Sequence, residues 1–178
     1  LFITCLILMF AKPVTKGFIP GWFASEQDAT LVIIIDNSAS MAATRNGKTF
    51  LDISKNEALA LLPLYKKESQ IIISQTCPPK IVFKGKNYHP DIRKSVKYIE
   101  PTYGYDNLWE CLENLISDKS ITGIIKECAV FSDFMNYPDS SFNRNIEDLD
   151  SWKFYFIKQG KVENNISITN VSLINRLK

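Results

Sequence analysis

Hydrophobic residues alternate with polar segments along this chain, and their spacing predicts a series of strands. The run at 29–35 is apolar at nearly every position, which is typical of a strand buried on both faces of a parallel sheet. Comparable runs predict further strands at 70–76, 128–132 and 152–157, a short antiparallel partner at 80–83, and a final alternating strand at 166–174.

Helices are predicted between these strands. Ser54 and Glu57 have the spacing of a capping box, so we expect the first helix to begin at Ser54. Pro90 suits the first position of a second helix, and a third helix has an apolar face at 108–116. This alternation predicts a three-layer, Rossmann-like α/β fold: a central, mostly parallel sheet with one short antiparallel edge strand and helices on both faces.

The chain divides into three parts. Residues 1–11 are apolar apart from Thr4, and we interpret them as the C-terminal part of a transmembrane helix, because a complete span needs about 20 apolar residues. Residues 12–28 contain prolines and glycines and are interpreted as a linker, and 29–178 as the globular domain. Two alternatives stay open for the first segment: a signal-peptide core, or a buried first element of the domain.

Composition narrows the classes of function. The 178 residues are 46% hydrophobic and 22% charged, which suits one globular domain. A net charge of +2 without basic clusters argues against nucleic-acid binding as the main activity. The four cysteines have no metal-ligand or redox spacing, and a single histidine, His89, argues against a zinc site or a Ser-His catalytic pair.

Oxygen-bearing side chains follow two of the predicted strands. Asp36 ends the first strand, with Ser38 and Ser40 two and four residues later, and Asp133 ends the strand at 128–132. The carboxyl ends of parallel strands meet at one edge of the sheet, where open α/β sheets place their ligands. Carboxylate and hydroxyl oxygens suit a hard cation such as Mg²⁺. The pattern therefore predicts a divalent-cation site.

The segment Asp-Asn-Ser-Ala-Ser at 36–40 resembles the D-x-S-x-S signature of von Willebrand factor type A (vWA) domains. The segment Phe-Ser-Asp at 131–133 resembles the end of the fourth strand of that fold. The resemblance extends over about 29–174, most of the chain.

This resemblance implies a metal-ion-dependent adhesion site (MIDAS) for Mg²⁺, with Mn²⁺ or Ca²⁺ as alternatives. Asp36 would hold the metal through water, Ser38 and Ser40 would bind it directly, and Asp133 would lie in the outer shell. The open coordination position would receive an acidic residue of a protein partner. The implied activity is binding without catalysis.

The third motif of the site departs from the family pattern. The family has a threonine in a Gly-Gly-Thr loop before a helix, and Asp106 stands at that position. Asp106 is interpreted as a metal ligand, as the N-cap of the helix, or as both. Thr102 stands four residues earlier and would replace the missing threonine only if the loop were rebuilt. The glycine that follows the family's Thr-Asp is Phe134.

A narrower resemblance concerns membrane attachment. An apolar segment ending in Phe-Ala-Lys-Pro at 10–13, a short linker and then the strand into Asp36 resemble the membrane-anchored vWA proteins of the bacterial aerotolerance BatA/BatB group. This implies attachment to the bacterial inner membrane through the N-terminal helix, with the domain on the periplasmic face.

Other interpretations stay open. The polar residues at 36–40 could form only a strand-to-loop turn, which would leave a structural scaffold with a degenerate metal site. A haloacid-dehalogenase-like phosphotransfer enzyme would use Asp36 as nucleophile, but it needs a second acid where Ser38 stands. A serine hydrolase would need a G-x-S-x-G elbow, which the sequence lacks.

Overall fold

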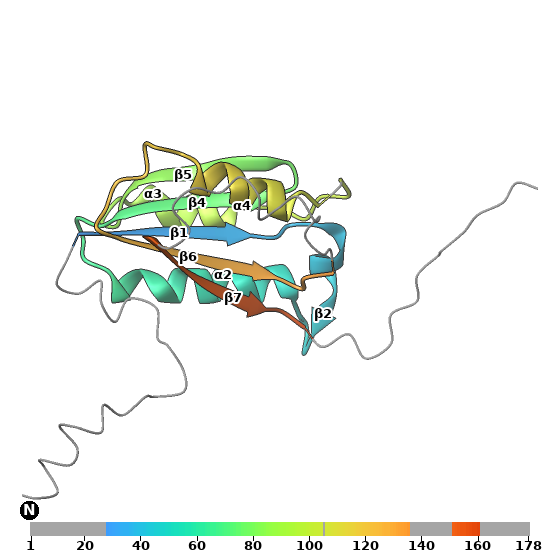
Figure 1. Cartoon of the computed structure of the whole chain (residues 1–178). Coiled ribbons are helices and arrows are strands. Elements are labelled where there is room, and N and C mark those ends of the chain that lie inside the picture. Colours follow the sequence, from blue (N-terminus) through green and yellow to red (C-terminus); the bar gives the residue numbers. More distant parts are fainter. Residues whose placement is uncertain (1–27, 105, 136–150, 161–178) are drawn as a thin grey trace, which may run out of the picture.

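The computed structural model describes residues 28–104, 106–135 and 151–160, which form a five-stranded sheet with helices on both faces (Figure 1). The strand order is β5-β4-β1-β6-β7, with β1 at the centre. Four strands are parallel, and β5 pairs antiparallel with β4. Their bounds are β1 (Ala29–Ile35), β4 (Gln70–Thr76), β5 (Pro79–Lys86), β6 (Ile125–Ser132) and β7 (Trp152–Lys158). The predicted fold class is confirmed.

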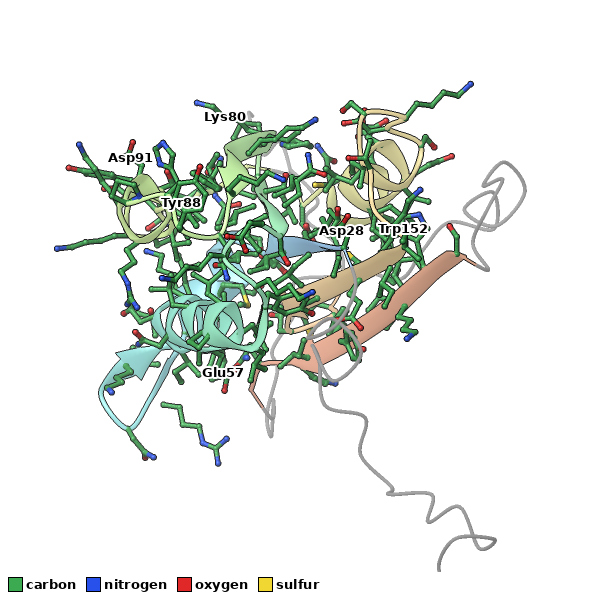
Figure 2. The ribbon with its side chains drawn as sticks, turned by 90° about the vertical axis from the view of Figure 1, so that its left-hand side faces the viewer. Asp28, Glu57, Lys80, Tyr88, Asp91 and Trp152 are labelled. Carbon is green, nitrogen blue, oxygen red and sulfur yellow. The ribbon has the colours of Figure 1, made fainter. Side chains whose placement is uncertain are left out.

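The central strand β1 is buried at all seven positions. Leu31 and Ile33 pack in the cluster that includes α2 (Phe50–Leu61) and α3 (Asp91–Lys97), whereas Val32 and Ile34 pack in the cluster that includes α4 (Leu108–Ile116). Seen along the strands, α2 and α4 lie on opposite sides of the sheet (Figure 2). A strand covered on both faces needs apolar residues at consecutive positions, which explains the uninterrupted run in the sequence.

Helix α2 begins at Phe50, so the predicted start at Ser54 was wrong. The Thr49 hydroxyl oxygen accepts a hydrogen bond from the Asp52 backbone N–H (3.0 Å). The same hydroxyl donates a hydrogen bond to Asp52 Oδ2 (2.7 Å). Ser54 lies inside the helix, where its hydroxyl donates to the Phe50 carbonyl (2.9 Å). Two patterns of hydroxyl and acid stand five residues apart in the sequence, and the earlier one caps the helix.

The segment between β1 and α2 contains a short helical turn and a hairpin. A 3-10 turn, η1 (Ala39–Ala42), precedes a small hairpin of β2 (Thr44–Arg45) and β3 (Lys48–Thr49). The two residues at its tip, Asn46 and Gly47, have φ of 53° and 76°, as a two-residue type I′ turn requires. The hairpin turn therefore spans 45–48, and its central Asn-Gly pair is the sequence that this turn type prefers.

The antiparallel edge strand β5 is also longer than predicted, because it has eight residues in place of the expected four. A register shift between Ile73 and Ser74 interrupts its ladder with β4. The predicted first segment, 1–11, and the predicted last strand, 166–174, lie outside the described residues. Of the helices in the described ranges, none has both the length and the apolar character needed to cross a bilayer.

One buried acid lies inside the fold, away from the predicted site. Glu127 on β6 is fully buried and accepts hydrogen bonds from the hydroxyls of Tyr65 and Tyr155, the latter at 3.2 Å. Burial and the Glu127 carboxylate together raise the pKa of both phenols. The two tyrosines thus stay protonated and donate to the acid in the folded protein.

Candidate metal site

Asp36 stands at the carboxyl end of β1 and is fully buried. Its Oδ2 accepts from the Ser132 hydroxyl (2.5 Å), and its Oδ1 accepts from the Ser38 backbone N–H (2.9 Å) and the Thr76 hydroxyl (3.3 Å). Ser132 and Thr76 end the strands on either side of β1. A carboxylate offers about four lone-pair positions, so these bonds fix its orientation and leave room for about one further contact.

The hydroxyls of the two serines that follow Asp36 lie close to each other. Ser38 is nearly buried, Ser40 is exposed, and their hydroxyl oxygens are 3.1 Å apart. Neighbouring ligands of an octahedral Mg²⁺ are about 2.9 Å apart, because each lies about 2.0–2.1 Å from the ion. The two hydroxyls therefore fit adjacent positions on one hard cation, and the same separation suits a hydrogen bond between them.

Asn37, which sequence reasoning did not select, connects the loops around the site. Its Nδ2 lies within hydrogen-bond distance of the carbonyls of Cys77 (2.7 Å) and Glu100 (3.0 Å), and its Oδ1 accepts from the Cys77 N–H (2.8 Å). Its own carbonyl accepts from the Thr102 N–H (2.8 Å). The only signal in the sequence was a polar residue directly after a buried strand, which must find internal partners if it is buried.

Thr102 lies beside the metal motif. Its backbone forms an isolated parallel bridge with Ser38, and its hydroxyl lies 3.2 Å from Asn37 Nδ2. Gly104 packs closely on the same edge, since a Cβ at that position would stand 3.0 Å from Cys77 Sγ. The loop that carries Thr102 therefore reaches Ser38 in this structure, although the sequence ranked Thr102 after Asp106.

Asp106 performs the capping role that the sequence offered as its alternative. Its Oδ1 accepts from the Leu108 N–H (3.0 Å), which opens helix α4, and Asn107 stands at the formal N-cap position. Burial raises the pKa of the Cys77 thiol, and the carboxylates of Asp106 and Asp36 raise it further. Both acids thus act on one buried thiol at this edge of the sheet.

Asp133 is also buried, at the carboxyl end of β6. Its Oδ1 accepts from the Met135 N–H (3.2 Å), and the Phe134 N–H donates to the Ser132 hydroxyl oxygen (2.9 Å). Phe134 has φ of +53°, in the left-handed region that glycine adopts most easily. The backbone therefore has the conformation that suits the family's glycine, although the residue is phenylalanine.

The donor set is compatible with a cation held mainly by hydroxyls and water. In the described part of the chain, no group of three or more His, Cys, Asp or Glu side chains lies close enough to hold a metal ion. Asp36, Asp106 and Asp133 are therefore not a cluster of three carboxylate ligands. Ser38 and Ser40 would have to supply the direct protein contacts, with the Asp36 carboxylate bound to the Ser38 backbone N–H.

Solved structures of other proteins share the fold of this chain. No family model matches the chain, and no curated protein matches it. The solved structure of the conserved hypothetical protein BatB from Bacteroides thetaiotaomicron aligns with a TM-score of 0.60 and 12% identity, over 73% of this chain and 66% of that one. Proximal thread matrix protein 1 from the mussel byssus aligns with a TM-score of 0.57 and 14% identity, over 74% and 38%.

The aligned region is thus only a part of each of these two proteins. At such identities the likeness concerns the fold. It supports a relation between this chain and BatB, and it agrees with the Rossmann-like α/β architecture described above.

Proposed function

We propose that this chain is a membrane-anchored vWA domain that binds a protein partner through a divalent cation at the carboxyl edge of its sheet, without catalysis. One observation carries the proposal. Asp36 is oriented by the Ser38 backbone N–H and by both neighbouring strands, and the same short segment carries two serine hydroxyl oxygens that are 3.1 Å apart. Such an arrangement of oxygens suits Mg²⁺, or Mn²⁺ or Ca²⁺ in its place.

Each residue has a separate task in this proposal. Ser38 and Ser40 bind the cation directly, Asp36 holds it through water, and Asp133 adds negative charge from the outer shell. Thr102 is the better placed of the two remaining candidates, because its backbone pairs with Ser38, whereas Asp106 caps a helix. When bound, the cation supplies the positive charge to which an acidic side chain of the partner coordinates.

Attachment to the bacterial inner membrane, with the domain on the periplasmic face, is part of the same proposal. Its support is the apolar segment at 1–11 together with the likeness of the fold to BatB. The alternative is a scaffold in which the same residues hold the loops together and bind no metal. Binding of the metal separates the two.

The test measures thermal midpoints with and without Mg²⁺ or Mn²⁺ in wild type, Ser40→Ala and Ser117→Ala. Ser40 is exposed and its hydroxyl contacts only Ser38 among the described residues, so its loss should spare the fold. A ligand at 100 times its Kd stabilises by about 2.7 kcal/mol, which is about 5–10 °C for a chain of this size.

We expect this shift in wild type and in Ser117→Ala, because Ser117 is an exposed serine at the C-terminal end of α4. The shift should be much smaller in Ser40→Ala. Direct titration with Mn²⁺, followed by its electron spin resonance signal, should give the same order. The absence of a shift in wild type, or an equal shift in Ser40→Ala, would favour the scaffold.

A further inference from the structure

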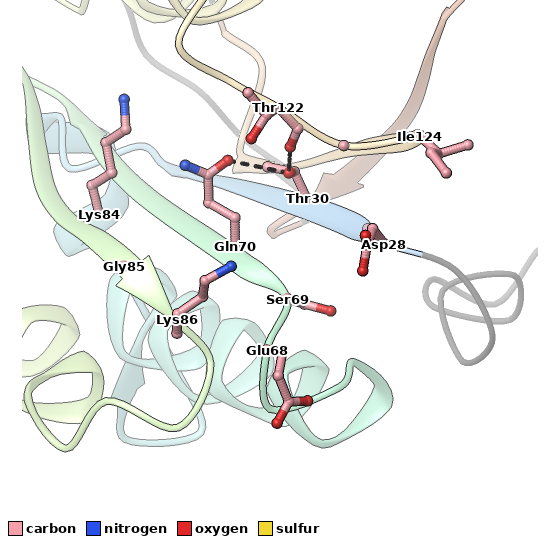
Figure 3. A pocket seen from close by; sticks show the side chains of 12 residues that line it. Asp28, Thr30, Glu68, Ser69, Gln70, Lys84, Gly85, Lys86, Thr122 and Ile124 are labelled. Carbon is pink, nitrogen blue, oxygen red and sulfur yellow. Dashed lines mark hydrogen bonds between the residues drawn. The ribbon is translucent and has the colours of Figure 1, made fainter.

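A pocket lies at the amino edge of the sheet, where the parallel strands begin, opposite the proposed metal site. It has a volume of about 610 Å³ and is formed where β1 and β4 begin and β5 ends (Figure 3). This volume is within the range of about 300–1,000 Å³ that is usual for small-molecule sites. The polar side chains that line it include Asp28, Glu68, Ser69, Gln70, Lys84 and Lys86.

The charges around this pocket are separated by sign. Lys84 and Lys86 extend from β5 on one side, whereas Asp28 and Glu68 lie on the other, at the start of β1 and just before β4 (Figure 3). Lys84 is committed elsewhere, because its Nζ lies 2.5 Å from Ser120 Oγ and 3.4 Å from Asp118 Oδ2. Lys86 is therefore the available cation of the pocket.

The other charges of the pocket have no oppositely charged partner among the described residues. Within the described ranges, Lys86, Asp28 and Glu68 form no ion pair with one another or with another side chain. Ser69, which lines the same pocket, is 5% exposed, and its hydroxyl has no hydrogen-bond partner among the residues described. Unpaired charges of both signs beside an unsatisfied hydroxyl indicate a place for an external polar molecule.

The floor of the pocket is held in place by a hydrogen-bonded group. The Thr30 hydroxyl lies 3.2 Å from Gln70 Oε1 and also contacts the Thr122 carbonyl. Gly123 closes this corner, since a Cβ there would stand 2.8 Å from Thr30 Oγ1. With its oxygen facing Thr30, the Gln70 carboxamide keeps its NH₂ group as a donor, so the pocket has a fixed polar floor.

We propose that this pocket binds a small zwitterion, a molecule with an ammonium group at one end and a phosphate or carboxylate at the other. The acidic end contacts the Lys86 ammonium, a compact point charge that suits either anion. The ammonium end contacts Asp28 and Glu68. The site is separate from the proposed metal site, which lies at the other edge of the sheet, so either proposal can fail alone.

The test titrates the full chain with O-phosphoethanolamine and follows backbone amide resonances by ¹H–¹⁵N NMR. Ethanolamine and methyl phosphate, each with one of the two charges, are titrated in parallel. We expect saturable shifts at Ser69, Gly85 and Gly123, and binding of the zwitterion up to about fivefold tighter than either half, which is the upper range for one solvent-facing ion pair. Titration with 4-aminobutyrate shows whether the acidic end is better supplied by carboxylate or by phosphate.

Charge variants identify the two ends. Lys86→Gln should lower the affinity for O-phosphoethanolamine to that for ethanolamine, and Glu68→Gln combined with Asp28→Asn should lower it to that for methyl phosphate. Lys80→Gln is the matched control, because Lys80 is an exposed lysine of β5 outside this pocket. All these residues are exposed, so thermal midpoints should stay near wild type.

Three results would overturn the proposal. The first is the absence of saturable shifts with any of the probes. The second is equal affinity for the zwitterion and its halves, and the third is a Lys86→Gln variant that binds as wild type does. Resonances at the carboxyl edge, such as the Ser38 amide, should not move in any of these titrations.

Discussion

The polar residues at the two edges of the sheet differ in how many partners they have within the described part of the chain. At the carboxyl edge, Asp36 and Asn37 are buried, and each has several hydrogen-bond partners within the chain. At the amino edge, Lys86 and Glu68 have no ion-pair partner among the described residues, and the buried Ser69 hydroxyl has no hydrogen-bond partner there. Buried polar groups are costly unless paired, so the two edges contribute differently to stability.

Because of this difference, substitutions at the two edges should affect stability and ligand binding to different degrees. At the carboxyl edge the Asp36 carboxylate binds both neighbouring strands and the segment that carries the proposed metal ligands, so substitutions there should change both stability and binding. At the amino edge the polar residues hold few parts of the chain together, and substitutions should change binding while stability stays nearly constant. The comparison can therefore be tested by unfolding experiments alone.

The largest effect is expected for Asp36→Ala. The change leaves the Ser132 and Thr76 hydroxyls and the Ser38 N–H without their acceptor in a fully buried position. Loss of hydrogen bonds to a buried charged group, with donors left unsatisfied, should lower the free energy of unfolding by about 3 kcal/mol. Urea unfolding in the presence of a chelator measures this without any contribution from metal.

Asp36→Asn is the control variant that keeps the size and shape of the side chain and removes its charge. Its carboxamide oxygen can still accept from Ser38, and the Ser132 hydroxyl can turn to accept from the new NH₂ group. We expect a cost near about 1 kcal/mol. If Asp36→Ala were as stable as wild type, the carboxyl edge would not be the saturated edge that its hydrogen bonds indicate.

Most of the fold follows from hydrophobic periodicity. The apolar run of β1 predicted a strand buried on both faces, and β4 and α4 have the bounds that their patterns gave. The start of α2 was misplaced because Thr49 with Asp52 and Ser54 with Glu57 are similar capping patterns five residues apart. The choice between them depends on packing that a local pattern does not contain.

The site was predicted only in part, for a related reason. Asp36 and Ser38 stand in one short segment, so a motif is enough to find them. The contributions of Asn37, Thr76 and Ser132 depend on which strands neighbour β1 and where the loops return. Those are long-range relations, and a sequence pattern without the sheet order does not specify them.

The second prediction concerns Glu127, a buried acid that is saturated as Asp36 is. The raised pKa of Tyr65 means that its phenol stays protonated in the folded state at a pH where the unfolded chain, with a pKa near about 10, ionises. The unfolded state then binds fewer protons. The free energy of unfolding should therefore fall above about pH 10, by about 1.4 kcal/mol per pH unit from this group.

Tyr65→Phe isolates this contribution. The variant should be less stable at neutral pH because Glu127 loses a donor, but its stability should fall less steeply between about pH 10 and 11 than that of wild type. The buried thiols have raised pKa values too, and they contribute equally to both proteins. Urea unfolding at a series of alkaline pH values measures the two slopes, and equal slopes would contradict the assignment.

The smallest effect, and the sharpest contrast, is expected for Ser69→Ala at the amino edge. The substitution removes a buried hydroxyl that has no hydrogen-bond partner in the described ranges, so the folded state loses nothing and avoids an unsatisfied polar group. We expect no change or a stabilisation of up to about 1 kcal/mol, measured by urea unfolding. Ser132→Ala is the matched substitution at the carboxyl edge.

Ser132 is also a buried serine, but it donates to Asp36 and accepts from the Phe134 N–H, so its replacement removes one donor from the buried carboxylate and the acceptor of a half-buried N–H. It should lower the free energy of unfolding by about 2 kcal/mol. The same chemical change at the two edges would then have opposite or clearly unequal effects. A loss of about 2 kcal/mol in both variants would mean that Ser69 has a partner of its own and that the amino edge is as saturated as the carboxyl edge.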